Sequence, residues 1–268
     1  MRIWHQSATV LETLPEYAAS LARQYAEVGR PDTEVVLHGV PPGTYGSSSP
    51  AQVIPYPAER HRIAQIVLDQ VRNAEREGFD AVMLATFVEP ALREARSALD
   101  IPVTSMAESA LLAGFSAAGR VGLVTLSPLS VHMLQEIVDR HRFGPRVAAI
   151  VTLDPPFTEF EMHHAFEDPA PLEKAFEDAS RQAIAAGADL LIPGEGVLNE
   201  FLVHAGKQEV DSVGVMNSTA VSLLHTEMLV ESYRKAGLRT GRRWQHPRVP
   251  SEVQRDLEAP ATIAAGGA

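Results

Sequence analysis

Short apolar runs, each ending in a polar residue, recur along the chain between segments with helical spacing of apolar residues. Two of these runs, at residues 78–86 and 187–195, share one pattern: Gly-x-Asp, an apolar stretch, then a polar residue at the same distance from the glycine. A weaker copy follows each of them, at residues 100–105 and 211–217. An apolar run that follows a helix in this way is typical of a buried strand in a parallel sheet.

Thr86 and Glu195 stand at the ends of the two repeated runs. In open α/β sheets, ligands bind beyond the carboxyl ends of the strands. We therefore expect two similar lobes, each directing one polar residue into a shared cleft. Gly-x-Asp alone is also an ordinary helix-to-strand turn, but the similar spacing of both pairs of copies favours two related halves.

The segments between the runs carry the helical pattern. In the first of them, Leu14, Tyr17, Leu21 and Tyr25 recur at helical spacing and predict an apolar helix face. Residues 120–127 repeat the character of the chain start, with an arginine, an apolar stretch and then hydroxyl residues that open a helix. We interpret them as the first strand of the second lobe.

The whole pattern is β-α-β-α in two similar halves. It predicts an α/β fold of two pseudo-symmetric, doubly wound parallel-sheet lobes, with the active site in the cleft between them. Strands are predicted at residues 2–5, 34–38, 78–86, 101–104, 120–127, 147–152, 187–195 and 213–215. Helices are predicted at residues 13–28, 58–77, 91–99, 106–118, 130–141, 172–186, 197–205 and 218–236.

This layout also predicts the domain organisation. The first lobe comprises residues 1–117 plus 217–240, and the second comprises residues 118–216. The last long helix returns to pack on the first lobe. Residues 241–268, basic at first and then rich in alanine and glycine, form a C-terminal arm or tail.

Composition narrows the class of protein. The chain of 268 residues is 45% hydrophobic and contains no cysteine, so disulfides, thiolate metal ligands and thiol nucleophiles are excluded. A net charge of −11 argues against nucleic acid as a partner, because phosphate contacts need clustered Lys and Arg. The basic cluster at residues 239–248 is interpreted as a solvated or subunit-contacting segment.

The chain start lacks the charged and apolar regions of a signal peptide, and no run approaches the roughly 18 apolar residues of a membrane helix. We therefore expect a cytoplasmic protein with no membrane partner. Two irregular segments, residues 39–57 and 154–171, interrupt the alternation. The first is interpreted as a flap over the cleft, with a floppy surface loop as the alternative. The sequence leaves open whether the two segments close over a ligand.

The second irregular segment contains several potential metal ligands: Glu159, Glu161, His163, His164, Glu167 and Asp168. Adjacent histidines point in different directions on a helix or strand, so their spacing is poor for one metal ion. We expect no metal and no cofactor. The sequence leaves open whether Glu89, Glu108, His5 or Asn217 reaches the cleft.

Two candidate residues also have ordinary structural interpretations. Ser127 precedes Pro128, which suits a first helical turn, so its hydroxyl either holds a substrate carboxylate or serves as an N-cap. Glu89 lies in the first turn beyond the Thr86 strand. It is either a second carboxylate in the cleft or a partner for the positive end of the next helix.

The layout resembles the aspartate/glutamate/hydantoin racemase superfamily, which includes arylmalonate decarboxylase and maleate isomerase. The resemblance covers roughly residues 1–238. The segment after the first repeated run is most similar to the hydantoin racemase branch, where Cys-Phe-x-x-Pro-x-Leu is typical. The matching segments are His5-Gln6-Ser7, Ala85-Thr86-Phe87-Val88-Glu89-Pro90-Ala91-Leu92, Pro102-Val103 with the following helix, Arg120 to Thr125, and Gly194-Glu195-Gly196.

In that superfamily, two pseudo-equivalent cysteines flank the substrate carbon and exchange its proton without a cofactor. The resemblance puts Thr86 and Glu195 at those positions, so a two-thiol racemase is excluded. A buried Glu can have its pKa raised towards neutrality, which suits general acid–base catalysis, whereas a Thr hydroxyl is a poor base. Thr86 can instead donate a hydrogen bond to a developing oxyanion. This asymmetry favours one-base chemistry.

Three functions remain open. The first is an isomerase, racemase-like enzyme or decarboxylase that acts at a carbon beside a carboxylate or ring-amide carbonyl. The second is a hydrolase of a small amide, imide or ester, with Glu195 activating water or Thr86 as a nucleophile assisted by His5 or Glu89. The third is a non-catalytic binder on a racemase scaffold. The resemblance also suggests a homo-oligomer. The candidate substrate-binding residues are His5, Gln6, Ser7, Phe87, Glu89, Thr125, Ser127, Gly194, Gly196 and Asn217.

Overall fold

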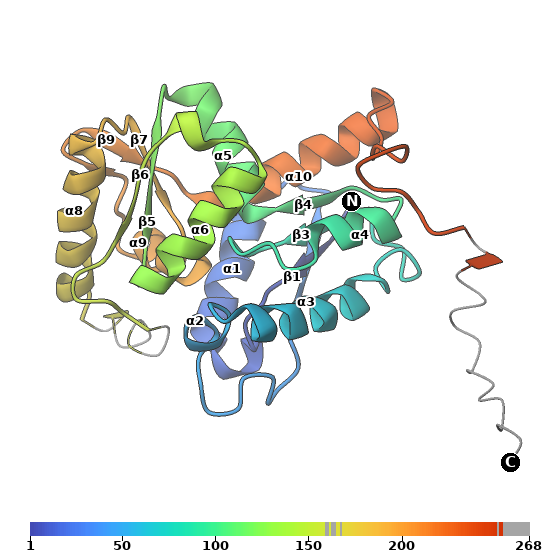
Figure 1. Ribbon diagram of the computed structural model, residues 1–268, viewed down its shortest axis with the longest axis horizontal. Helices are drawn as coiled ribbons and strands as arrows, with labels where there is room; N and C mark the ends of the chain where they lie inside the picture. Colours follow the sequence, from blue (N-terminus) through green and yellow to red (C-terminus); the bar gives the residue numbers. More distant parts are fainter. Residues whose placement is uncertain (159–160, 162–164, 167, 251, 254–268) are drawn as a thin grey trace, which may run out of the picture.

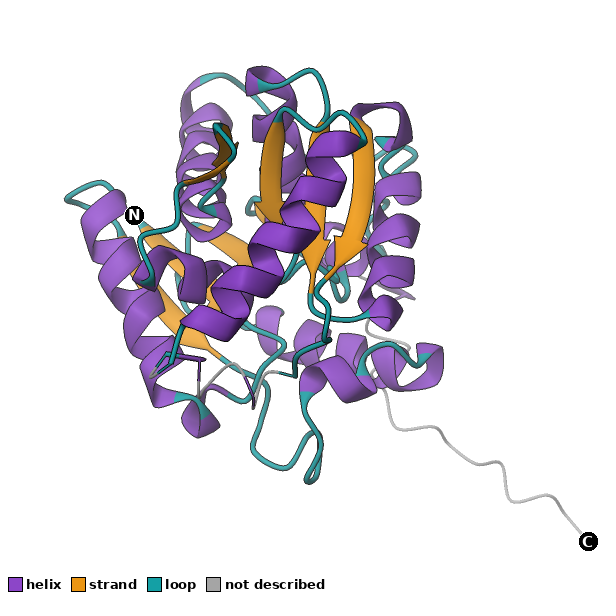
Figure 2. Ribbon diagram, turned by 90° about the vertical axis from the view of Figure 1, so that its left-hand side faces the viewer, coloured by secondary structure: helices purple, strands orange, loops and turns teal. Residues whose placement is uncertain are grey.

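Two separate sheets form the framework of the protein, with helices on both faces of each (Figures 1 and 2). The computed structural model describes residues 1–158, 161, 165–166, 168–250 and 252–253. The first sheet has the strand order β2-β1-β3-β4, and its paired strands are all parallel. Its strands are β1 (Arg2–Gln6), β2 (Glu34–His38), β3 (Ala81–Leu84) and β4 (Val103–Ser105).

The second sheet repeats this order. It runs β6-β5-β7-β9-β8, so β5, β6, β7 and β9 correspond to β1, β2, β3 and β4, and the repeated sequence runs become β3 and β7. The prediction of two α/β halves with parallel sheets is confirmed. The short edge strand β8, which pairs antiparallel with β9, was not predicted. The strands are β5 (Val121–Thr125), β6 (Val147–Thr152), β7 (Leu190–Pro193), β8 (Glu209–Val210) and β9 (Val213–Val215).

The helices follow the predicted pattern closely, apart from the segment at residues 58–77. There the helix ends at Val71 and the chain continues through tight turns to Gly78, whose φ of +76° suits glycine. The helices are α1 (Pro15–Val28), α2 (Pro50–Val53), α3 (Pro57–Val71), α4 (Leu92–Ala98), α5 (Met106–Ala117), α6 (Pro128–Arg140), α8 (Ala170–Ala185), α9 (Gly196–His204) and α10 (Ser218–Lys235), with 3-10 turns η1 (Leu11–Thr13) and η2 (Gly144–Arg146).

The two halves share a continuous hydrophobic core. One buried cluster joins Phe87 and Met106, next to the first sheet, to Leu123 and Leu134 of the second half. The last long helix, α10, contacts α1, α5, β3 and β4, so it packs on the first sheet although it follows the second in sequence (Figure 1). The exact domain boundaries stay a prediction.

The basic segment after α10 folds back on its own chain. Arg242 and Arg248 both pair with Asp100, and Ser97 of α4 donates a hydrogen bond to the carbonyl of Pro247. Part of this cluster therefore neutralises an acidic side chain of the same molecule. Within the described part of the chain, no helix combines the length and apolar character needed to cross a bilayer.

Candidate active site

A pocket lies where the carboxyl ends of β1 and β3 face those of β5 and β7. In each sheet these two strands are neighbours, and the strand order reverses direction between them. α/β folds commonly bind ligands at such a reversal point. The pocket is narrow, with a cavity volume of about 40 Å³. Its lining residues are Ser7, Ala8, Thr9, Tyr17, Pro50, Ala51, Ile54, Ala85, Thr86, Val88, Leu126, Ser130, Met133, Glu195, Gly196 and Val197.

Thr86 and Glu195 both line this pocket, at equivalent strand ends in the two halves. The Oγ1 of Thr125, at the end of β5, donates a hydrogen bond of 2.7 Å to Oε1 of Glu195. Thr125 is fully buried and does not line the pocket itself. Its observed contact therefore orients the Glu195 carboxylate.

The residues that flank Glu195 are glycines for steric reasons. A Cβ at Gly194 would come within 2.8 Å of Leu134 Cδ1 and 3.2 Å of the Val124 carbonyl oxygen. A Cβ at Gly196 would come within 2.7 Å of the Tyr17 hydroxyl. The absence of side chains thus allows the β7 end to approach both α6 and α1.

Ser7 lines the pocket as expected, and its Oγ accepts a hydrogen bond of 3.0 Å from the backbone N–H of Thr9. The first irregular segment also reaches the pocket, where Pro50, Ala51 and Ile54 form part of the lining. Residues 50–53 of this segment form the short helix α2, which was not predicted. Its proline at the first turn and Ser49 before it are signals that favour a helix start.

His5 lies outside the pocket lining. It is fully buried, and its Nδ1 forms a hydrogen bond of 2.8 Å with the Tyr25 hydroxyl. Desolvation, with a smaller contribution from His38, lowers the pKa of His5 to about 3. The structure therefore does not support His5 as the base that activates Thr86, because His5 is not among the pocket-lining residues and its low pKa makes it a weak base.

Gln6, Phe87 and Ser127 also lie outside the lining. Gln6 accepts a hydrogen bond from Trp4 Nε1 and donates one to Gln70 Oε1, and Phe87 is in the core. Ser127 is the N-cap of α6, because its hydroxyl accepts a hydrogen bond from the backbone N–H of Ser130. The simpler interpretation of Ser127 thus accounts for its observed contact.

Glu89 belongs to a buried polar network rather than to the pocket lining. Its carboxylate accepts hydrogen bonds from Ser105 Oγ and from His141 Nε2, the latter at 2.8 Å, and Arg140 lies 3.9 Å away. Its φ of +49° is rare for a residue other than glycine. Because Glu89 follows Thr86 closely, these contacts attach the Thr86 loop to the end of α6.

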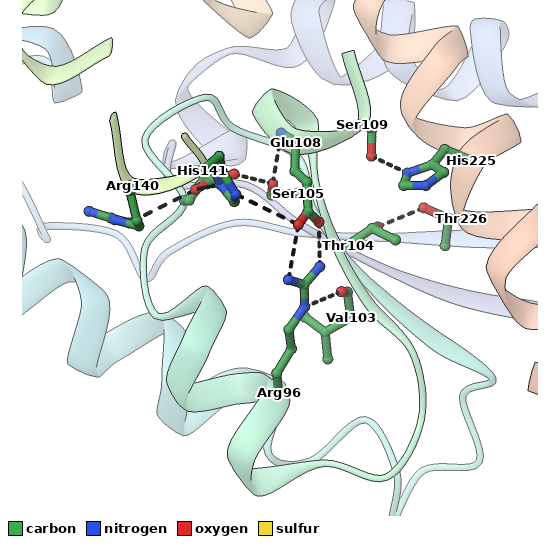
Figure 3. A network of polar contacts seen from close by, with 11 residues as sticks. Arg96, Val103, Thr104, Ser105, Glu108, Ser109, Arg140, His141, His225 and Thr226 are labelled. Atoms are coloured by element: carbon green, nitrogen blue, oxygen red, sulfur yellow. Dashed lines mark hydrogen bonds and ion pairs between the residues drawn. The ribbon is translucent and has the colours of Figure 1, made fainter. Parts of the chain in front are cut away.

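Glu108 lies in the same network, outside the pocket lining. Arg96 donates two hydrogen bonds to its carboxylate, and Ser105 Oγ caps its backbone N–H (Figure 3). Burial by itself raises the pKa of the Glu108 carboxyl. The hydrogen bonds and charge of Arg96, together with His141 and His225, outweigh this effect, so the net shift of the pKa is downward. This residue is held as an anion between α4 and α5.

Asn217 caps α10, and its amide donates a hydrogen bond of 2.8 Å to Gln24 of α1. Beside it lies Glu200, a fully buried carboxylate that the sequence analysis did not single out. Glu200 accepts hydrogen bonds from Ser20 at 2.6 Å, Gln24 at 2.7 Å and Thr219 at 2.7 Å. These contacts join α1, α9 and α10, and none of the four residues lines the pocket.

The structure adds pocket residues that the sequence pattern did not indicate, notably Tyr17, Ser130 and Met133. In the sequence, helical spacing indicated Tyr17 only as one residue of the apolar face of the first helix. Among the described residues, no group of three or more His, Cys, Asp or Glu side chains is arranged to hold a metal ion. Four of the ligand candidates in the second irregular segment, Glu159, His163, His164 and Glu167, lie outside the described residues.

Comparisons with known proteins agree with this architecture. The Asp/Glu/hydantoin racemase family matches residues 12–226. A hydantoin racemase from Pseudomonas sp. (strain NS671) is 28% identical over 170 residues, which are 63% of this chain and 66% of that protein, just under two thirds. A hydantoin racemase from Rhizobium meliloti is 26% identical over 108 residues, 40% of this chain and 43% of that one.

Solved structures show the same fold. Allantoin racemase from Klebsiella pneumoniae superposes with a TM-score of 0.72 and 21% sequence identity, covering 93% of this chain and 94% of that chain. The family match extends over most of the sequence and includes the ends of both β3 and β7. The chain belongs to the Asp/Glu/hydantoin racemase family.

Proposed function

We propose that this protein catalyses cofactor-independent proton transfer at a carbon next to a carboxylate or ring-amide carbonyl. Glu195 acts as the single acid–base residue, and Thr86 donates a hydrogen bond to the developing oxyanion. The observation that carries the proposal is the shared pocket: both side chains line it, at equivalent strand ends of two related halves. Family membership supports the same type of reaction.

The asymmetry of the two side chains narrows the reaction. A carboxylate takes up and returns a proton near neutral pH far more readily than an unactivated alcohol does. Thr125 supports the role of Glu195 because its hydrogen bond orients the carboxylate. One acid–base residue suits an isomerisation in which the same group removes and returns the proton. It also suits a decarboxylation, which needs a single protonation of the enolate.

Ring amides are the preferred substrates to test. The relatives are named as hydantoin racemases, and a structural neighbour is named as an allantoin racemase. A hydrolase that uses Thr86 as its nucleophile has less support, because neither His5 nor Glu89, the bases considered for it, is among the residues that line the pocket.

The test is proton NMR in deuterated water with a panel of hydantoins, α-amino acids, arylmalonates and cyclic imides. Deuterium should enter at the α-carbon of a substrate, or at the site of decarboxylation. Glu195→Gln should slow this step by about 10²–10⁴-fold, the usual effect of losing a general base. Glu209→Gln is the control, because Glu209 is exposed on the edge strand β8 and lies outside the pocket lining.

Three other results contradict the proposal. Exchange that persists in Glu195→Gln removes Glu195 as the base. Cleavage products without α-carbon exchange favour a hydrolase, and Thr86→Ala then becomes the next variant. Tight binding of a panel compound without turnover, unchanged in Glu195→Gln, supports a binding protein on the racemase scaffold.

A further inference from the structure

One phenol hydroxyl lies between the two halves of the pocket. Tyr17, on α1, lines the pocket together with Thr86 and Glu195. A Cβ on Gly196 would lie 2.7 Å from the Tyr17 hydroxyl and 3.9 Å from the carbonyl oxygen of Ala85. Since Gly196 follows Glu195 and Ala85 precedes Thr86, the hydroxyl lies near the backbone next to both candidate residues.

The surrounding residues hold the Tyr17 ring in this position. Only 4% of Tyr17 is exposed, and its ring belongs to a core cluster that includes Leu21, Val197 and Leu198. A tyrosine packed this way has few accessible rotamers, so its hydroxyl is positioned before a ligand arrives. Preorganised donors stabilise charge effectively because they need no reorganisation during the reaction.

We propose that Tyr17 is a catalytic residue whose hydroxyl donates a hydrogen bond to the substrate oxygen that becomes negatively charged. This inference rests on the proposed function. Glu195 removes the α-proton, and the electron pair of the broken C–H bond moves onto the carbonyl oxygen. Tyr17 keeps its proton and stabilises that oxygen, together with Thr86. When Glu195 returns the proton to carbon, the charge on the oxygen disappears.

The chemistry of phenols favours this assignment. A phenol has an ordinary pKa of about 10 and is a stronger hydrogen-bond donor than an alcohol such as that of Thr86. Tyr17 comes from a helix and Thr86 from a strand end, and both hydroxyls would donate to the same oxyanion. Other oxyanion sites also use paired donors. Gly196 then has a specific purpose, since any side chain there would occupy the position of the hydroxyl.

Tyr25 provides a matched control on the same helix. It is 6% exposed and packs in the same core cluster, but its hydroxyl pairs with His5 and it does not line the pocket. Tyr17→Phe and Tyr25→Phe each remove one buried oxygen atom and leave the ring. Any general effect of losing a buried hydroxyl should therefore appear in both variants, whereas a catalytic effect should appear in one.

The experiment measures kcat, KM and thermal midpoint for wild type, Tyr17→Phe, Tyr25→Phe and Glu195→Gln, with the substrate found by deuterium exchange. Tyr17→Phe should lower kcat by about 10²–10³-fold, as loss of one oxyanion donor does, and change KM much less. Tyr25→Phe should keep the wild-type kcat. Gly196→Ala should lower kcat as Tyr17→Phe does, and combining the two should add little further loss.

Two results overturn the inference. If Glu195→Gln abolishes exchange while Tyr17→Phe retains the wild-type kcat, Tyr17 has no catalytic role and the proposed function stands. If both phenylalanine variants lower kcat equally and lower the thermal midpoint, the effect is structural.

A third result concerns the proposed function itself. If Glu195→Gln retains full exchange, the proposed function fails, and that failure is visible without any tyrosine variant.

Discussion

Burial of His5 should make the free energy of unfolding fall in acid, and His5 itself should account for much of this fall. In the folded protein the ring is neutral, because burial and His38 lower its pKa to about 3. In the unfolded chain a histidine takes up a proton below about pH 6.5. The stabilising contribution is therefore present above about pH 6.5, and it is lost as the pH falls towards 3.

The size of the effect follows from the difference between the two pKa values. Each pH unit between them changes the free energy of unfolding by about 1.4 kcal/mol for one proton. Between about pH 7 and about pH 4.5, His5 should thus account for a loss of roughly 2.5 kcal/mol. That is a large share of the roughly 5–15 kcal/mol by which domains are stable.

Urea denaturation at several pH values, with wild type and His5→Gln, measures this loss. The variant loses the contact with Tyr25 at every pH, so it should be less stable near neutrality, but its stability should fall less on acidification. His132→Gln is the control, because 81% of that side chain is exposed and the variant should keep the wild-type pH dependence. If His5→Gln shows the same loss between the two pH values as wild type, the reasoning from burial is refuted.

Two further substitutions test the supports of the pocket. Replacing either Glu89 or His141 by glutamine should destabilise the protein by about 1–3 kcal/mol, since each change weakens a buried hydrogen bond to a carboxylate, and the double variant should lose less than the sum. Additive losses in urea denaturation would exclude a direct interaction. Gly194→Ala should cost about 1–3 kcal/mol through its clash with Leu134, whereas Gly241→Ala, which has open space around it, should cost much less. Equal stability of the two alanine variants would contradict the steric argument.

The sequence by itself determined the architecture and the family. Apolar runs with a polar end mark buried strands, and their repetition predicted two related halves with Thr86 and Glu195 at equivalent positions. The position of both side chains follows from the order of residues along the chain, because the residues just after a parallel strand lie at the carboxyl edge of the sheet. The antiparallel edge strand β8 was missed because a two-residue strand leaves no periodic signal.

The tertiary structure alone decided which other side chains meet the pocket. His5 and Ser7 lie only two residues apart, yet Ser7 lines the pocket while His5 pairs with Tyr25 in the core. Glu89 follows Thr86 closely, yet it is paired with His141, far away in sequence. Tyr17 has the spacing of an ordinary core residue and nevertheless reaches the pocket. Contacts between distant segments fix the direction of each side chain, and the local sequence pattern does not predict those contacts.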